Sequence, residues 1–130
     1  MHMFVRVKRC SGVFEFSLVD ADLSLDKPVA KTILEIGAVE EAFLYSWQAW
    51  YAIADNLVTA DLDYEIKCNA AKDLSEWLPP ITRELLIESR KNDLRGLAEI
   101  GSGIAKRQLE EPIVLNENDP INKIADWLNS

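Results

Sequence analysis

The stretch that decides the predicted fold is PVAKTILEIGAVEEAFLYSWQAWYAIADNL, residues 28–57. Apolar residues recur here three or four positions apart, the spacing of one face of an amphipathic helix. The row consists of Ile33, Ile36, Phe43, Trp47, Trp50, Ala54 and Leu57. Glu40 interrupts the row, and Gly37 marks a place where a helix could kink. A second apolar row widens this face, so we expect one long central helix that is covered on more than one side.

Two short runs near the N-terminus alternate apolar and polar residues with the period of two that is expected of β-strands. The runs cover residues 3–8 and 13–19, and residues 9–12 between them have the composition of a turn. Residues 22–25 could extend this hairpin. Its apolar face would hold Val5, Val7, Phe14, Phe16 and Leu18, and its solvated face Arg6, Lys8, Glu15 and Ser17. Because a lone hairpin is only marginally stable, its apolar face must pack on other elements.

The rest of the chain is predicted to be helical. Asp26 has the residue type of an N-cap and Pro28 suits the first turn of the long helix. Further helices are expected at residues 62–78, 81–91 and 94–111, the last interrupted by two glycines, and after Asp119-Pro120. The predicted fold is therefore α+β and mostly helical. An N-terminal hairpin (3–19) packs on a bundle of four to six helices (27–129) in a single domain, 1–130.

Composition favours a protein of a reducing compartment. The chain has 130 residues, of which 48% are hydrophobic, enough to fill one core. Its two cysteines, Cys10 and Cys68, are far apart in sequence and show no CxxC spacing. No stretch approaches the roughly 18 apolar residues of a membrane span, so we expect a cytoplasmic protein. Because Met1 and His2 precede a second possible start at Met3, the only histidine receives no functional weight.

The net charge of −8 is concentrated in the first half of the chain. Residues 15–65 contain eleven acids and only two bases, Lys27 and Lys31, for a net charge of −9. The acids are Glu15, Asp20, Asp22, Asp26, Glu35, Glu40, Glu41, Asp55, Asp61, Asp63 and Glu65. Gathered on one surface, they would attract a basic protein partner, as the surface of an inhibitor or immunity protein does. The alternative interpretation is a solvated surface that keeps the protein soluble.

Residues 94–109 resemble the helix-hairpin-helix motif of DNA-binding proteins. Leu94 and Leu97 match its first helix, Ile100-Gly101 its turn, and Ala105 and Leu109 its second helix. The resemblance implies that the turn's backbone amides hold a DNA phosphate, a role open to any helix N-terminus that carries glycine.

In such a site Gly101, Ser102 and Gly103 would contact the phosphate, and Lys106 and Arg107 would contact the neighbouring backbone. The sequence departs from the family at Glu99, where a glycine is usual and where a carboxylate would repel a phosphate. The alternative is a glycine turn that lets two helices pack closely.

Two apolar groups have both a structural and a functional interpretation. Trp47, Trp50, Tyr51 and Trp77, with Glu40 one turn away, could line a ligand pocket or could form core. We expect Glu40 to reach water at the end of the apolar row, because burying an unpaired carboxylate is costly. The C-terminal row of Ile121, Ile124, Trp127 and Leu128 could dock into a partner's groove or could pack on its own domain.

No catalytic constellation is recognisable in the sequence. The chain contains no GxxxxGK loop, no GxSxG elbow, no HExxH and no Cys/His pair at metal-ligand spacing, and we predict neither an enzyme nor a cofactor. The acids at 61, 63 and 65 more simply begin a helix, where they complement the N-terminal dipole. We therefore expect a small acidic binding protein with a basic protein partner. The alternative is a nucleic-acid accessory protein that uses the glycine turn, and a third class is a small-molecule binder that uses the tryptophans.

Overall fold

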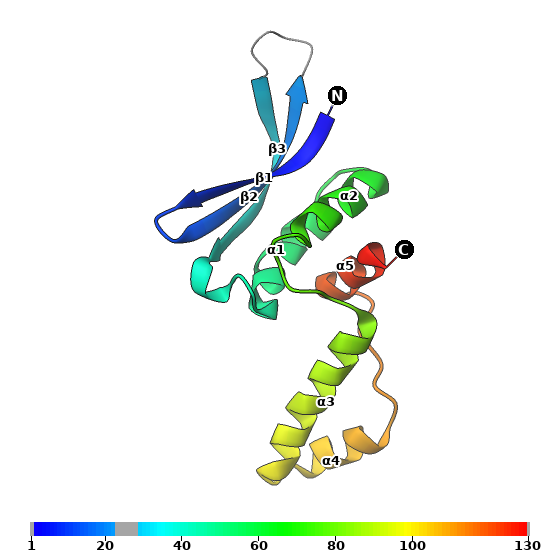
Figure 1. Cartoon of the computed structure of the whole chain (residues 1–130). Coiled ribbons are helices and arrows are strands. Elements are labelled where there is room, and N and C mark those ends of the chain that lie inside the picture. The colour runs from blue at the N-terminus through cyan, green and yellow to red at the C-terminus, as the bar shows by residue number, and fades with distance from the viewer. Residues whose placement is uncertain (1, 23–28, 130) are drawn as a thin grey trace. The chain divides into compact units, whose positions relative to one another are not determined.

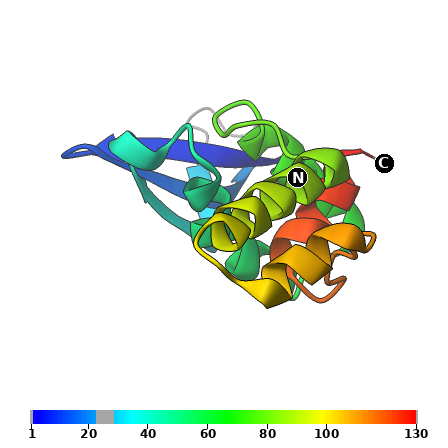
Figure 2. The same ribbon diagram turned by 90° about the horizontal axis from the view of Figure 1, so that it is seen from below.

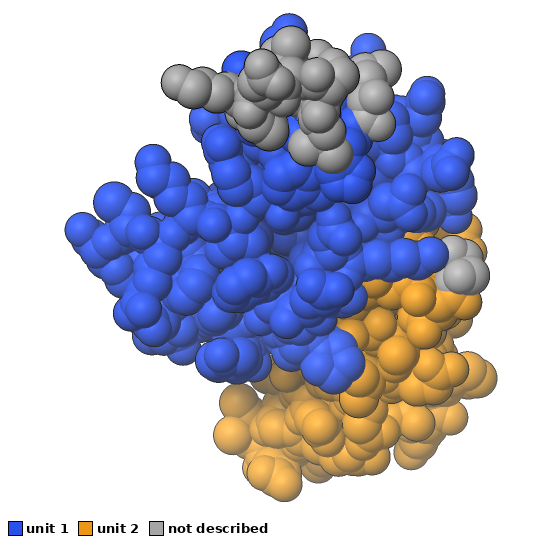
Figure 3. Space-filling model, turned by 45° about the horizontal axis from the view of Figure 1, so that its top comes forward, with its two compact units in different colours: residues 1–80 blue, residues 81–130 orange. Residues whose placement is uncertain are grey.

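The computed structural model describes residues 2–22 and 29–129, and it has an α+β fold with 50% helix and 25% strand. The chain forms two compact units, unit 1 from Met1 to Pro80 and unit 2 from Ile81 to Ser130, which Figure 3 shows in different colours. The described residues form a three-stranded sheet and five α-helices. None of these helices is both long and apolar enough to cross a membrane.

Unit 1 begins with an antiparallel sheet whose strands follow one another in chain order, β1-β2-β3 (Figure 1). The strands are β1 (His2–Cys10), β2 (Val13–Asp22) and β3 (Val29–Glu40). A two-residue turn joins β1 to β2, and both of its residues, Ser11 and Gly12, have positive φ angles of 51° and 78°. This backbone matches the right-handed twist of the paired strands, so it closes a tight hairpin.

The predicted hairpin and the predicted faces of its strands are confirmed. Val5 lies opposite Leu18 and Val7 opposite Phe16, so these apolar residues share one face of the sheet. Lys8 lies opposite Glu15 on the other face. This apolar face contributes the buried side chains of Phe16 and Leu18 to the core. Of the predicted extension at 22–25, only Asp22 lies within the described residues, as the last residue of β2.

The predicted long helix over residues 28–57 is wrong. Residues 29–40 form the third strand, residues Glu41–Phe43 form a short 3₁₀ turn (η1), and helix α1 spans only Trp47–Thr59. The predicted helix start at Asp26 and Pro28 lies outside the described residues. The expected kink residue, Gly37, lies in the strand instead.

Two β-bulges explain why this strand has the sequence pattern of a helix. The pairing of β2 with β3 shifts between Phe16 and Ser17 and again between Leu18 and Val19, so Ile36 and Ile33 are extra residues on β3. Each extra residue interrupts the strict alternation of a strand. Buried Ile36 and Val39 therefore come to be three positions apart, which is a helical spacing.

The core of unit 1 lies between the sheet and helix α1. Trp50 and Ile53 are fully buried, and the indole N–H of Trp50 donates a hydrogen bond to the Pro79 carbonyl oxygen at 2.7 Å. A Cβ atom on Gly37 would lie 2.9 Å from Cγ2 of Ile53, so the strand needs glycine where α1 crosses it. Helix α2 (Tyr64–Leu74) contacts β1 and is shorter than the predicted helix at 62–78.

Unit 2 consists of the helices α3 (Arg83–Glu99), α4 (Gly103–Glu110) and α5 (Pro120–Leu128). The predicted break at Asn92-Asp93 is wrong, since α3 is continuous and the Arg95 guanidinium donates to Asn92 Oδ1 at 2.8 Å along its surface. The predicted cap at Asp119 is confirmed, because its carboxylate accepts the Ile121 N–H. Side-chain caps thus fix where the last two helices begin, with Ser102 accepting the Ala105 N–H in α4.

The turn between α3 and α4 closes α3 by a Schellman motif. Gly101 has a φ of 101°, its N–H donates to the Ala98 carbonyl, and the Ser102 N–H donates to the Leu97 carbonyl. These two bonds satisfy carbonyl groups that a helix end otherwise leaves without a partner. The two helices then pack together, with Leu94 and Ala105 buried, and Figure 2 shows the pair from a second direction.

Gly96→Ala is expected to stabilise the protein by about 0.5–1 kcal/mol, because glycine in an exposed helix interior loses that much relative to alanine. A Cβ atom at Gly96 would meet no atom within 4 Å, so the new methyl group causes no clash. Gly101→Ala is the matched control and should destabilise, because its φ of 101° strains any L side chain. Urea denaturation measures the change in the free energy of unfolding of each variant. A destabilised Gly96→Ala variant would contradict the prediction.

Candidate binding surface

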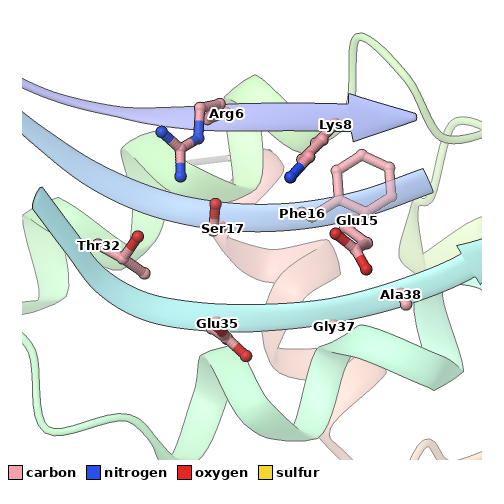
Figure 4. A pocket seen from close by; sticks show the side chains of 9 residues that line it. All are labelled: Arg6, Lys8, Glu15, Phe16, Ser17, Thr32, Glu35, Gly37 and Ala38. Carbon is pink, nitrogen blue, oxygen red and sulfur yellow. The ribbon is translucent and has the colours of Figure 1, made fainter. Parts of the chain in front are cut away.

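One face of the sheet carries a hollow of about 330 Å³ that is lined only by residues of the three strands (Figure 4). The register places its charged and hydroxyl side chains on the side opposite to Val5, Val7 and the buried core. We call this side the open face. Its side chains are Arg6 and Lys8 from β1, Glu15 and Ser17 from β2, and Thr32, Glu35 and Ala38 from β3.

The charges of the open face are arranged in strips. Both cations come from β1, and both carboxylates come from the next two strands, as the side chains in Figure 4 show. Lys8 lies directly opposite Glu15, and Arg6, Ser17 and Glu35 form a row across the three strands. Among the described residues, no ion pair within 4.0 Å includes any of these four charged groups. Their charges are therefore available to a ligand.

The outer edge of β1 is only partly covered. The N–H of Val5 points away from β2 and donates to the Asp73 carboxylate of α2 at 3.2 Å. Because N–H groups alternate in direction along a strand, those of Val7 and Arg9 also point outward. Among the described residues, neither N–H has a recorded partner beyond the sheet. The edge of β1 is therefore capped by a side chain at Val5 and free farther along.

The acids of residues 15–65 that the structure describes do not form one surface in unit 1, and Asp26 and the side chain of Asp22 lie outside the described residues. Glu15 and Glu35 lie on the open face, whereas Asp55 is on α1, which packs against the opposite face of the sheet. Asp61 and Asp63 are exposed in the connection between α1 and α2. Glu41 is held in an ion pair with Arg9 at 2.9 Å. The acids on unit 1 are therefore spread over several of its elements.

The glycine turn has a helix–turn–helix shape, but its amides are mostly in use. The N–H groups of Gly101 and Ser102 close α3, and Ser102 itself caps α4. A Cβ atom at Gly101 or Gly103 would meet no atom within 4 Å, so close helix packing is not the reason for these glycines. Lys106 and Arg107 are exposed on α4.

The aromatic residues proposed for a pocket do not converge on one. Trp50 is core with 0% exposure, and Trp47 is half-buried. Tyr51 is 56% exposed, and Trp77 is 42% exposed with its ring 6.1 Å from that of Phe14. Glu40 is exposed, as expected, at the end of β3. None of the five lines the hollow of the open face.

The C-terminal row is already covered in the folded chain. Ile121, Ile124 and Trp127 are buried and Leu128 is half-buried, so the row offers no free docking surface. Asp61, Asp63 and Glu65 are exposed around the start of α2. Within the described ranges, no group of three or more His, Cys, Asp or Glu residues is arranged to hold a metal ion.

Three residues of the open face were missed by sequence reasoning. Thr32, Glu35 and Ala38 were assigned to the long helix, so they could not be placed beside the residues of β2. The signal available was the β-branched composition of residues 29–39, which contain two valines, two isoleucines and a threonine. Comparison of the chain with known protein families, with curated proteins and with solved structures finds no match.

Proposed function

We propose that the chain is a small non-enzymatic protein that binds a protein partner through the open face of its sheet. The observation that supports this proposal is a hollowed, polar sheet face on which four charged side chains lack ion-pair partners among the described residues. Charged groups arranged in this way give an interface its specificity and its register rather than most of its affinity. The opposite, apolar face of the same sheet packs on α1, and this packing holds the strands of the open face in place.

The partner of this proposal carries both signs of charge. A basic group of the partner would lie over Glu15 and Glu35, and an acidic group over Arg6 and Lys8. The basic partner expected from the sequence thus becomes a basic group of the partner that contacts only Glu15 and Glu35. The charges elsewhere on unit 1 act mainly as a diffuse field, because salt screens charges beyond about 8 Å at physiological ionic strength.

Photo-crosslinking tests this proposal directly. A photo-reactive amino acid at Ala38, an exposed residue of the open face, should capture the partner in cells, and the same group at Gln48, exposed on α1, should not. Reversing the carboxylates by Glu15→Lys with Glu35→Lys should reduce capture about tenfold or more, the effect of losing about 1.4 kcal/mol.

The control is a second pair of reversals, Asp61→Lys with Asp63→Lys, which changes the net charge equally at the α1–α2 connection. Capture that survives the open-face reversals but is lost with the control pair would assign binding to the other acidic group. Equal capture at Ala38 and Gln48 would contradict the proposed surface.

A nucleic-acid accessory function is a second candidate. The supporting observation is that Gly103 has open space around it and begins α4, next to the exposed cations Lys106 and Arg107. A helix N-terminus of this kind attracts a phosphate. Duplex DNA binding at low salt should then weaken when Lys106→Glu and Arg107→Glu are combined, and the slope of binding against salt should fall by about two. Absence of binding, or binding unchanged by the substitutions, would remove this candidate.

A further inference from the structure

We propose that the partner of the open face contacts unit 1 with an extended acidic segment, which adds as a fourth strand to the free edge of β1. This inference rests on the proposed function and specifies its partner. It follows from three features of β1: the direction of its backbone groups, the position of the Arg9 side chain, and the charges of its open-face residues.

The first feature is the phase of hydrogen bonding along β1. The tight turn closes at the pair Cys10 and Val13, and hydrogen-bonded pairs alternate with non-bonded pairs from there. Arg6 with Ser17 and Lys8 with Glu15 are therefore pairs whose backbone N–H and C=O groups bond to each other. The outward bond from Val5 to Asp73 independently confirms this phase. The N–H and C=O groups of Val7 and Arg9 consequently face outward, where an added strand can bind them.

The second feature is that the Arg9 side chain leaves this edge uncovered. Its guanidinium donates to both carboxylate oxygens of Glu41, at 3.1 and 2.9 Å, and lies over the Phe14 ring, 5.8 Å from its centroid. Phe14 is on β2, so the Arg9 side chain leans across the sheet and away from the outer edge. The Arg9 side chain therefore does not cover the outward main-chain groups of Val7 and Arg9.

The third feature decides the charge of the added strand. Side chains of directly opposed residues on neighbouring strands lie about 4.5–5.5 Å apart at their Cβ atoms. On the open face an added strand would therefore place alternate side chains beside Arg6 and Lys8, which are both exposed. Carboxylates at those positions would pair with the two cations. The side chains between them would face the side of Val5 and Val7 and can be apolar or small.

Lysine near a sheet edge also has a protective interpretation, since charges at edges discourage pairing with other strands. The two roles are compatible, because cations that repel a basic strand, and that a neutral strand would have to bury unpaired, attract an acidic one. The chain itself also places a carboxylate against this edge, at Val5.

Hydrogen exchange with a designed peptide tests the proposal on the full chain. The probe is a short capped peptide in which glutamate and threonine alternate, so that its glutamates share one face. Binding should slow exchange of the Val7 and Arg9 amides by about tenfold or more, because these groups become hydrogen-bonded. The same peptide with N-methyl groups on the pairing residues, and a peptide of equal composition with its glutamates clustered, should give no protection.

Charge variants complete the test. Arg6→Glu combined with Lys8→Glu should weaken the alternating peptide about tenfold. The same change in net charge at two exposed cations of unit 2, Arg90→Glu combined with Lys123→Glu, should not. Binding without protection of Val7 and Arg9, or no binding at all, would overturn strand addition. The proposed function is judged separately, because crosslinking from Ala38 reports a partner whether or not its segment pairs with β1. Loss of both results would remove both proposals.

Discussion

Trp50→Ala is expected to lower the free energy of unfolding by about 3–5 kcal/mol, the cost of removing a large aromatic side chain from a core. Trp50 is fully buried in unit 1, and its indole N–H donates to the Pro79 carbonyl at 2.7 Å. Proteins of this size are stable by about 5–15 kcal/mol, so the loss could amount to most of the stability of unit 1. Far-UV circular dichroism during urea denaturation measures the change.

Trp50→Phe separates packing from hydrogen bonding at this position. Phenylalanine fills part of the same space but cannot donate, so the Pro79 carbonyl loses its indole donor. We expect a cost intermediate between the wild-type protein and Trp50→Ala, with about 1–3 kcal/mol from the unsatisfied carbonyl if water cannot reach it. Equal costs for the two substitutions would show that the hydrogen bond, and not the volume of the ring, carries the effect.

Gly37→Ala has the second largest expected effect, a destabilisation of about 2–5 kcal/mol from backbone strain and overpacking together. Gly37 has a φ of 151°, which L side chains rarely adopt. Its missing side chain also leaves room for Ile53, whose Cγ2 would lie 2.9 Å from a new Cβ atom. Hydrogen exchange of the β3 amides should increase together with the loss of global stability, because the strand and α1 meet here.

A double-mutant cycle separates the two causes at Gly37. Ile53→Ala removes the clashing Cγ2 methyl group but leaves the backbone angle unchanged. If the clash dominates, Gly37→Ala should cost much less in the Ile53→Ala background than in the wild type, and the two effects will not add. Additive effects would instead assign the whole cost to the backbone angle. A Gly37→Ala protein as stable as the wild type would contradict the packing of β3 on α1 described above.

The sequence predicts correctly those elements whose signals are local. The hairpin follows from alternation in residues 3–8 and 13–19, and the last helix follows from the cap at Asp119 before Pro120. Both signals depend on neighbouring residues alone, so no tertiary contact can override them easily. For the same reason the sequence correctly predicts that Arg6, Lys8, Glu15 and Ser17 share one face of the hairpin.

The long helix shows where local reasoning fails. Ile33 and Ile36 are the extra residues of two bulges, and bulges depend on the partner strand rather than on the residues themselves. Their insertion converts a spacing of two into a spacing of three, which a pattern search cannot distinguish from a helix. Because residues 28–57 were predicted to be a helix, Glu35 was not placed on the open face. The break expected at Asn92-Asp93 failed differently, since packing of Leu94 in unit 2 outweighs weak helix propensity.

The two bulges of β3 also determine how the length of this strand could change. A residue removed at Ile33 or Ile36 would leave every other residue of the strand facing the side it faces now, because the partner strand already skips those two positions. A residue removed anywhere else would turn the remaining side chains over, bringing Glu35 into the hydrocarbon interior or Val39 into water. Because Ile36 is fully buried and Ile33 is exposed, Ile33 is the position where this strand can lose a residue without opening a cavity in the core.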